Sequence, residues 1–198
     1  VRGKNGMVVT ASELASKVGV EILKKGGNAV DAAVAVGFAL AVTYPAAGNI
    51  GGGGFMVIHL SDGTNTTIDY REKAPLAATE FLYQDSLGNF LPEKSQIGVT
   101  SSGVPGSVAG LIYALEKYGT LSLAEVIQPA IDLARNGFVL EYRLARSLEY
   151  ETESFNKFES SKKTFTKNGT PYIEGELFIQ NDLAYTLEQI KLKGLDGF

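Results

Sequence analysis

Residues 28–60 read NAVDAAVAVGFALAVTYPAAGNIGGGGFMVIHL. Asn28 can cap a helix of small and apolar residues over residues 29–42, which the pair Tyr-Pro then ends. The glycine-rich segment 48–54 follows, and residues 55–60 have the apolar composition of a buried strand. We therefore predict a buried helix, a tight loop and a strand in that order.

The charge pattern of this region raises the question of a membrane span. Residues 32–61 contain no Asp, Glu, Lys or Arg, and a spanning helix needs about 20 apolar residues. However, Pro45 and glycines 51–54 interrupt the run, and an open glycine loop cannot face lipid. We expect this region to form the core of a folded domain without a membrane span.

A helix is predicted before this segment and a hairpin after it. Thr10 and Glu13 have the spacing of a capping box, which predicts a helix over residues 11–25. Asp62-Gly63 predicts a hairpin turn, and residues 66–71 predict the returning strand. The order of elements indicates an α/β domain.

The remaining residues predict more helices joined by loops. Ser122 and Glu125 form a second possible capping box, and Pro129 is expected to bend or disrupt the helix that follows it. In chain order we predict a loop over 72–103, helices over 107–118 and 123–136, another beyond Tyr142, a polar surface excursion over 151–170 and a helix over 182–193. No repeat or linker divides the chain, so we expect residues 1–198 to form one domain.

The composition excludes several classes of function. The 44% hydrophobic and 20% charged residues are typical of a globular protein, and the net charge of -4 argues against nucleic acid or anionic membrane as a partner. Cysteine is absent, which excludes a disulfide scaffold, a zinc-thiolate site and a cysteine nucleophile. His59 is the single histidine, so a catalytic triad or a multi-histidine metal site would depend on it. We expect no metal and no cofactor.

The glycine cluster of residues 48–55 is the most conspicuous short motif. Consecutive backbone amides can bind an anion. A phosphate loop, however, runs from a strand into a helix and usually carries Lys followed by Ser or Thr, whereas here a helix comes first, a strand follows and that pair is missing. A backbone crossing too crowded for side chains is the favoured interpretation, with a nucleotide-binding module as the alternative.

Arg71, at the end of the returning strand, is the candidate binding residue. Its guanidinium can hold a carboxylate by two parallel hydrogen bonds. Most single arginines at strand ends form ion pairs instead, and Asp69 and Glu72 are near enough in sequence to be partners. We assign no catalytic role to His59 or to Thr66-Thr67, because threonines favour strands in their own right.

Four segments together resemble the opening of a gamma-glutamyltranspeptidase. They are GMVVTASELASKVGVEILKKGGNAVDAAVAVGFALAVTYPAAGNIGGGGFMVI (6–58), DYREKAP (69–75), SGVPGSVAGL (102–111) and KYGTLSLAEVIQPAIDLARNGF (117–138). The likeness extends from about Gly6 to the end of the chain. Several long motifs in the right order are far more specific than a glycine pattern alone.

The resemblance implies an N-terminal-nucleophile hydrolase, an α/β (α+β) fold built as an αββα four-layer sandwich. The family precursor cuts itself before a threonine into a large and a small subunit, and the freed threonine uses its own α-amine as base to attack the γ-glutamyl amide of glutathione or a relative. Water or the amine of an amino acid or peptide then takes the acyl group. By this resemblance, Arg71 binds the α-carboxylate of the donor substrate.

The chain departs from the family pattern at the nucleophile. The family's threonine is followed by threonine and histidine, whereas Thr66-Thr67 is followed by Ile68, so we place the nucleophile downstream of Phe198. We therefore expect the N-terminal portion of the large subunit, inactive alone, with a partial set of helices and strands and with the small subunit as partner. No signal peptide is visible in residues 1–17, and resemblance alone indicates the periplasm or the cell exterior. An acylase of the same fold and a non-catalytic relative are the alternatives.

Overall fold

The computed structural model describes residues 3–198, which divide into two compact units. The first unit comprises the chain up to Asn49 together with Ile112–Phe198, and the second comprises Ile50–Leu111. Two compact units of one chain can belong to a single cooperative domain. The expectation of one domain therefore stays a prediction.

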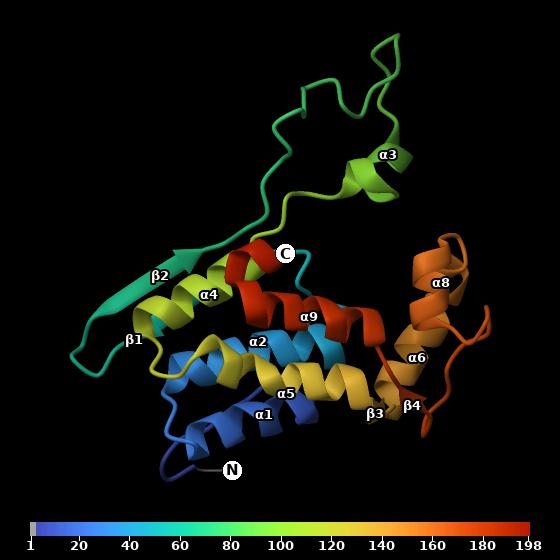
Figure 1. Ribbon diagram of the computed structural model, residues 1–198. Helices are drawn as coiled ribbons and strands as arrows, with labels where there is room; N and C mark the ends of the chain where they lie inside the picture. Colours follow the sequence, from blue (N-terminus) through green and yellow to red (C-terminus); the bar gives the residue numbers. More distant parts are fainter. Residues whose placement is uncertain (1–2) are drawn as a thin grey trace. The chain divides into compact units, whose positions relative to one another are not determined.

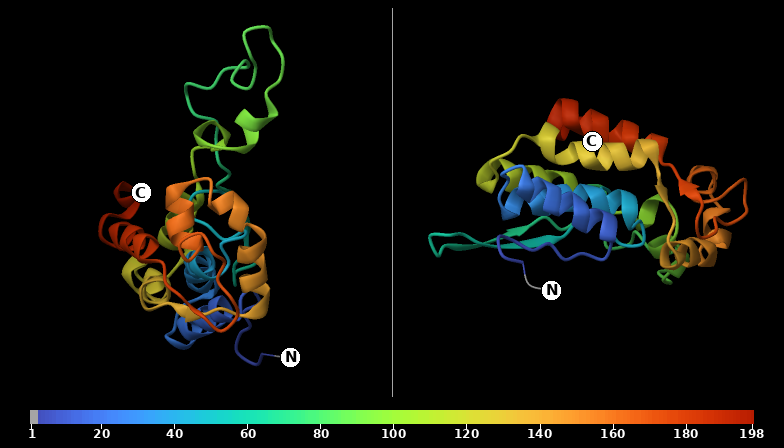
Figure 2. Two further views of the ribbon diagram at one scale, coloured as in Figure 1. Left: turned by 90° about the vertical axis from the view of Figure 1, so that its right-hand side faces the viewer. Right: turned by 90° about the horizontal axis from the view of Figure 1, so that it is seen from below.

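Four helices form the core of the first unit (Figure 1). Helix α2 (Ala29–Thr43) packs against α1 (Glu13–Lys24) and α5 (Leu123–Asn136), and α5 in turn packs against α9 (Asn181–Lys193). Figure 2 shows that the axes of the four helices are roughly parallel or antiparallel to one another. The predicted buried helix is confirmed, because α2 is covered on most sides and residues such as Phe38 are wholly inaccessible to solvent.

Helix α1 begins with a different cap from the one that the sequence indicates. Ser12 is the N-cap, and its side chain accepts a hydrogen bond from the backbone N–H of Ala15 at 3.5 Å. The hydroxyl of Thr10 instead donates to the Ser12 carbonyl at 2.6 Å. The capping box predicted from Thr10 is thus wrong, because the cap position lies directly before Glu13 and is occupied by another hydroxyl residue.

The start of α2 is tied to a distant turn of the chain. The Asn28 side chain caps the helix, accepting from the N–H groups of Val30 and Asp31, and its amide nitrogen donates to the carbonyl of Tyr118 at 2.7 Å. Asp31 is fully buried and its carboxylate accepts from Thr120 and Leu121, in the turn between α4 (Ser107–Tyr118) and α5. This link joins segments some 90 residues apart.

Helix α5 has the boundaries that its local signals predict. Ser122 and Glu125 form the reciprocal capping box, and Gly137 ends the helix with a positive φ of 74°. The predicted disruption at Pro129 is not observed, since the helix is assigned without a break from Leu123 to Asn136. Packing against both α2 and α9 stabilises the helix on either side of the proline.

The C-terminal part of the first unit is built around one phenylalanine. Strands β3 (Phe138–Val139) and β4 (Leu177–Phe178) pair antiparallel, and the buried ring of Phe178 contacts three other rings at centroid distances from 5.2 to 6.3 Å. The other elements are α6 (Tyr142–Tyr150), α7 (Thr152–Phe155), α8 (Glu159–Phe165) and η2 (Gly194–Gly197). The predicted polar excursion therefore contains two short helices.

The second unit contains a hairpin and a long excursion. Strands β1 (Phe55–His59) and β2 (Asn65–Asp69) are antiparallel, with Phe55 opposite Asp69 and His59 opposite Asn65. A short helix α3 (Pro92–Gln96) and the turn η1 (Val99–Ser101) interrupt the loop that follows, as Figure 1 shows in green. The prediction that residues 72–103 are mostly loop is confirmed.

Only one face of the hairpin is buried. Ile58 and Ile68, which lie on the same face, are less than a tenth exposed, whereas Phe55 is 63% and Val57 80% exposed. The prediction of a buried strand is wrong for this second face, whose apolar side chains stay more than half exposed. A two-stranded sheet with a bare apolar face is at most marginally stable by itself.

The fold is mostly helical. In the described part of the chain the strands form only two sheets of two strands each, so the four-layer sandwich stays a prediction. No helix within residues 3–198 is long and apolar enough to cross a membrane.

Candidate functional site around Arg71

Arg71 lies in an extended segment that is held on two sides. Immediately before it, the backbone N–H of Tyr70 donates to the carbonyl of Gly54 at 3.0 Å, which continues the pairing of the hairpin. Two residues after it, Lys73 and Val104 exchange backbone hydrogen bonds of 3.1 and 2.7 Å. The backbone of Arg71 is therefore fixed between two neighbouring segments.

The side chain of Arg71 is accessible and has two neighbours. It is 58% exposed, its Nε lies 3.5 Å from the Glu72 carboxylate, and its guanidinium carbon lies 5.8 Å from the centroid of the Phe55 ring. The carboxylate of Asp69 instead accepts the backbone N–H of Arg71 at 3.0 Å. Of the two partners expected from sequence, only Glu72 forms the ion pair, and at this exposure such a pair contributes at most about 1 kcal/mol.

The ring of Tyr70 rests on glycines from two separate motifs. A Cβ built at Gly54 would lie 2.9 Å from Tyr70 Cε2, and one at Gly110 would lie 2.6 Å from Tyr70 Cδ1. At Gly106 a Cβ would meet the Tyr70 carbonyl carbon at 2.9 Å and the Arg71 carbonyl oxygen at 3.1 Å. Real Cβ atoms do not approach other atoms this closely, so we call these three glycines the Tyr70 seat.

The glycine cluster also makes a backbone crossing. The carbonyl of Gly52 accepts hydrogen bonds from the N–H groups of Gly106 and Ser107, at 2.8 and 3.0 Å. A Cβ at Gly53 would lie 2.6 Å from the Glu72 backbone nitrogen, whereas one at Gly51 would meet nothing within 4 Å. The interpretation of the cluster as a crowded crossing is confirmed at Gly53 and Gly54.

Burial makes the Tyr70 hydroxyl harder to ionise. The ring is partly buried, and this burial raises the pKa of the Tyr70 hydroxyl above its ordinary value. A tyrosine hydroxyl is neutral at physiological pH even at its ordinary pKa, so the shift moves Tyr70 further from acting as an anionic base.

The other sequence candidates lie away from Arg71. His59 is exposed near the hairpin turn, with Nδ1 at 2.8 Å from the Asn65 side-chain oxygen, whereas Arg71 follows the opposite end of the hairpin. Thr66 and Thr67 are strand residues opposite Ile58 and Val57. The structure therefore groups Arg71 with Tyr70, Glu72 and Phe55. Sequence reasoning did not identify Phe55 as a neighbour of Arg71.

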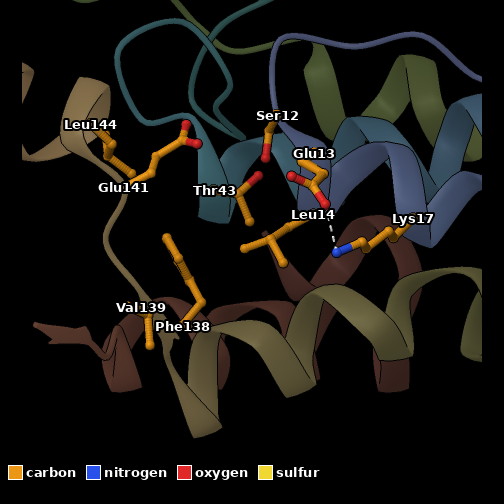
Figure 3. A pocket seen from close by; sticks show the side chains of 9 residues that line it. All are labelled: Ser12, Glu13, Leu14, Lys17, Thr43, Phe138, Val139, Glu141 and Leu144. Atoms are coloured by element: carbon orange, nitrogen blue, oxygen red, sulfur yellow. Dashed lines mark ion pairs between the residues drawn. The ribbon is translucent and has the colours of Figure 1, made fainter. Parts of the chain in front are cut away.

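Arg71 does not line the cavities described in the first unit. Figure 3 shows one of about 400 Å³, with Glu13 paired to Lys17 at 2.7 Å on one side and Glu141 across from it. Hydrogen bonding and charge attraction from Lys17 lower the pKa of Glu13. The cavity combines apolar walls with exposed charges. No single motif in the sequence indicated it, since its residues come from three separate segments.

Relatives of known sequence resemble the chain along its whole length. It is 56% identical over 199 residues to a glutathione hydrolase proenzyme of Pseudomonas sp. (strain A14), and 51% identical over 199 residues to that of Escherichia coli (strain K12). The alignments cover 100% of this chain but only 35% and 34% of the two relatives. The chain thus spans about a third of the length of the curated relatives that it matches.

Solved structures also match the fold of the chain over nearly its whole length. The gamma-glutamyltranspeptidase of Helicobacter pylori superimposes with a TM-score of 0.97 at 52% identity, over 100% of this chain and 57% of that one. A cephalosporin acylase from Bacillus halodurans superimposes with a TM-score of 0.84 at 28% identity, over 97% and 36%. The fold is therefore shared by enzymes named as transpeptidases and acylases. The sequence profile of the gamma-glutamyltranspeptidase family matches residues 15–198, and the chain belongs to this family.

Proposed function

We propose that the full-length protein hydrolyses and transfers the γ-glutamyl group of glutathione and related amides, and that residues 1–198 supply scaffold and a carboxylate-binding arginine. The observation that carries the proposal is 56% identity over 199 residues to a glutathione hydrolase proenzyme. In this proposal the αββα sandwich is completed by a small subunit cut from the same precursor, and the protein acts in the periplasm or outside the cell.

The proposed reaction proceeds through an acyl-enzyme. The hydroxyl of an N-terminal threonine, outside this chain, loses its proton to its own α-amine and attacks the γ-carbonyl carbon. The amide C–N bond breaks, and the leaving amine takes up the proton. Water or an acceptor amine then attacks the ester and releases the threonine. Without that threonine, residues 1–198 alone should show no turnover.

Arg71 is proposed to hold the α-carboxylate of the donor. Its side chain is 58% exposed and its nearest carboxylate approaches Nε at 3.5 Å, so a ligand can reach the guanidinium without breaking a buried ion pair. A planar guanidinium binds a carboxylate through two parallel hydrogen bonds. Phe55 and Glu72 lie beside the guanidinium in the same unit, and Asp69 accepts the backbone N–H of Arg71.

Expression of the full-length gene tests the reaction. We expect mass spectrometry to find two fragments, the smaller beginning with threonine, and we expect the purified protein to release the aniline from a γ-glutamyl anilide. One uncut polypeptide without turnover would contradict the enzymatic proposal.

Arg71→Lys tests the binding role. Lysine keeps the positive charge but cannot donate two parallel hydrogen bonds to one carboxylate. A hydrogen bond to a charged group typically contributes about 1.5 to 3 kcal/mol, so loss of one of the two parallel bonds should raise the donor KM substantially. Arg143→Lys is the control, because Arg143 is an exposed arginine on α6. Unchanged donor KM and kcat/KM in the Arg71 variant would remove this residue from the site.

An acylase of the same fold is the second candidate, supported by the cephalosporin acylase at 28% identity and a TM-score of 0.84. The higher identity to glutathione hydrolases favours the first candidate. Parallel assays with a γ-glutamyl anilide and a cephalosporin side-chain amide distinguish the two.

A non-catalytic relative would lack the downstream Thr-Thr-His sequence. A nucleotide-binding module would instead release heat on titration with ATP.

A further inference from the structure

We infer that Tyr70 is a positioning residue for Arg71, and that its ring, fixed by the Tyr70 seat, sets where the guanidinium meets the donor carboxylate. The inference rests on the proposed function, since it assigns a role relative to the substrate that Arg71 is proposed to bind. Tyr70 itself does not touch the substrate in this scheme.

The ring and the guanidinium are coupled through the backbone. Tyr70 and Arg71 are consecutive residues of an extended segment, and side chains of such neighbours point to opposite sides. The ring of Tyr70 is directed to Gly54 and Gly110, while the guanidinium of Arg71 lies over Phe55. A ring that is anchored on one side therefore helps to fix the Cα–Cβ direction of the next residue on the other side.

The contacts of the Arg71 side chain are too weak to hold it. Ordering a free arginine side chain costs up to about 2 kcal/mol of conformational entropy. Against this cost stand only the exposed pair with Glu72 and a guanidinium–ring distance of 5.8 Å. Fixing the Cα position through Tyr70 reduces the number of arrangements that the binding step must select. The two parallel hydrogen bonds between a guanidinium and a carboxylate require both groups to be aligned, so they are sensitive to small displacements of the guanidinium.

Ring carbons of Tyr70 make the closest side-chain contact at both glycines. Cε2 is the nearest atom to a Cβ at Gly54, followed by the hydroxyl oxygen at 3.0 Å, and Cγ is the nearest atom to a Cβ at Gly110, where the hydroxyl is not among the nearest atoms. Phenylalanine keeps the ring and leucine does not. Two variants of one residue therefore separate the ring from the hydroxyl.

Gly110 offers an independent way to move the ring. The residue lies inside helix α4, where replacing glycine by alanine favours the helix by roughly 1 kcal/mol. The new methyl group, however, would lie 2.6 Å from Tyr70 Cδ1 and must displace the ring. Gly51→Ala, in the glycine cluster of residues 48–55, is the control, because its methyl group would meet nothing within 4 Å.

The test uses the full-length enzyme and two donors, a γ-glutamyl anilide and the same compound with its α-carboxylate converted to a carboxamide. The measured quantity is the kcat/KM for the donor with the α-carboxylate divided by the kcat/KM for the donor with the carboxamide. We expect Tyr70→Leu and Gly110→Ala to lower this ratio by about tenfold or more, the factor that one charge-assisted hydrogen bond is worth. Tyr70→Phe and Gly51→Ala should keep it. In the background of Tyr70→Leu, Gly110→Ala should add little.

The outcomes separate this inference from the function on which it rests. If Arg71→Lys leaves the ratio unchanged, the proposed role of Arg71 is wrong. If Arg71→Lys lowers the ratio but Tyr70→Leu and Gly110→Ala slow both donors equally, the role of Tyr70 is merely structural and the inference is overturned. Should Tyr70→Leu fail to fold, Gly110→Ala decides, together with the unchanged ratio expected for Tyr70→Phe.

Discussion

The carboxylate of Asp31 accepts two hydrogen bonds from one residue, Thr120: one from its backbone N–H at 2.8 Å and one from its hydroxyl at 2.7 Å. The same carboxylate accepts from the N–H groups of Leu121 and Asn28, at 3.0 and 2.7 Å. Asp31 is fully buried, so a charged side chain in the first turn of the most apolar helix has all its partners supplied by the protein.

Asp31→Asn should lower the free energy of unfolding by about 2 kcal/mol or more, because an amide NH₂ would face N–H donors and leave buried groups unpaired. The measurement is urea unfolding of the full-length protein. Asp132→Asn is the control, since Asp132 is exposed and accepts from the side chain of Gln128 only. Equal effects of the two substitutions would contradict the role assigned to Asp31.

The stabilisation by Asp31 should depend on pH in the acid range. Burial by itself would raise the pKa of Asp31, but hydrogen bonds from Leu121, Thr120 and Asn28 together lower it below the ordinary value. The unfolded state then binds the proton more readily than the folded state. The contribution of Asp31 to the free energy of unfolding is therefore fully present above about pH 4 and is lost as the pH falls through the lowered native pKa. The difference in unfolding free energy between wild type and Asp31→Asn should shrink over that interval. A constant difference down to about pH 2 would refute the assignment.

Gln180→Ala should destabilise the protein by about 1 to 3 kcal/mol. The buried side-chain amide of Gln180 donates to the carbonyl of Val42 at 2.8 Å, and this carbonyl belongs to the last turn of α2. Removing the donor leaves a buried acceptor without this partner. Gln189→Ala on the same helix is the comparison, and thermal unfolding of both variants measures the difference. Similar melting temperatures for the two variants would argue against the link.

Gly53→Ala should destabilise the protein, whereas Gly51→Ala should be nearly neutral. A Cβ at position 53 would lie 2.6 Å from the backbone nitrogen of Glu72 and 2.7 Å from the Tyr70 carbonyl oxygen, and backbone atoms cannot move aside as the end of a flexible side chain can. Overpacking of this kind typically costs about 1 to 3 kcal/mol. Thermal unfolding of the two variants provides the measurement. Tolerance of alanine at both positions would show that the backbone crossing at Gly53 can accommodate a methyl group.

Local signals account for the elements that were predicted well. The box of Ser122 and Glu125 and the glycine at 137 define α5, because each acts within a few residues of the helix end. The same reasoning failed at α1, where two hydroxyl residues stand two positions apart and the nearer one caps the helix. Residue type alone does not determine which hydroxyl takes that place.

Contacts over long distances in the sequence were beyond prediction. The partner of Asp31 lies 89 residues away, and no periodicity relates the two positions. A charged residue within an otherwise apolar helix was the one available signal, because such a residue needs a partner when buried. At Arg71, the sequence indicated the strand and the neighbouring carboxylates. The contact with the Phe55 ring depends on how the hairpin pairs.

The bond from Gln180 to Val42 also bears on the order of events during synthesis. It closes a loop of 138 residues. A ribosome that adds about 5 to 20 residues per second needs on the order of 10 s to make that length. During that interval the final turn of α2 has been synthesised while its eventual donor is still untranslated. The carbonyl of Val42 therefore cannot form its native bond until synthesis has reached Gln180.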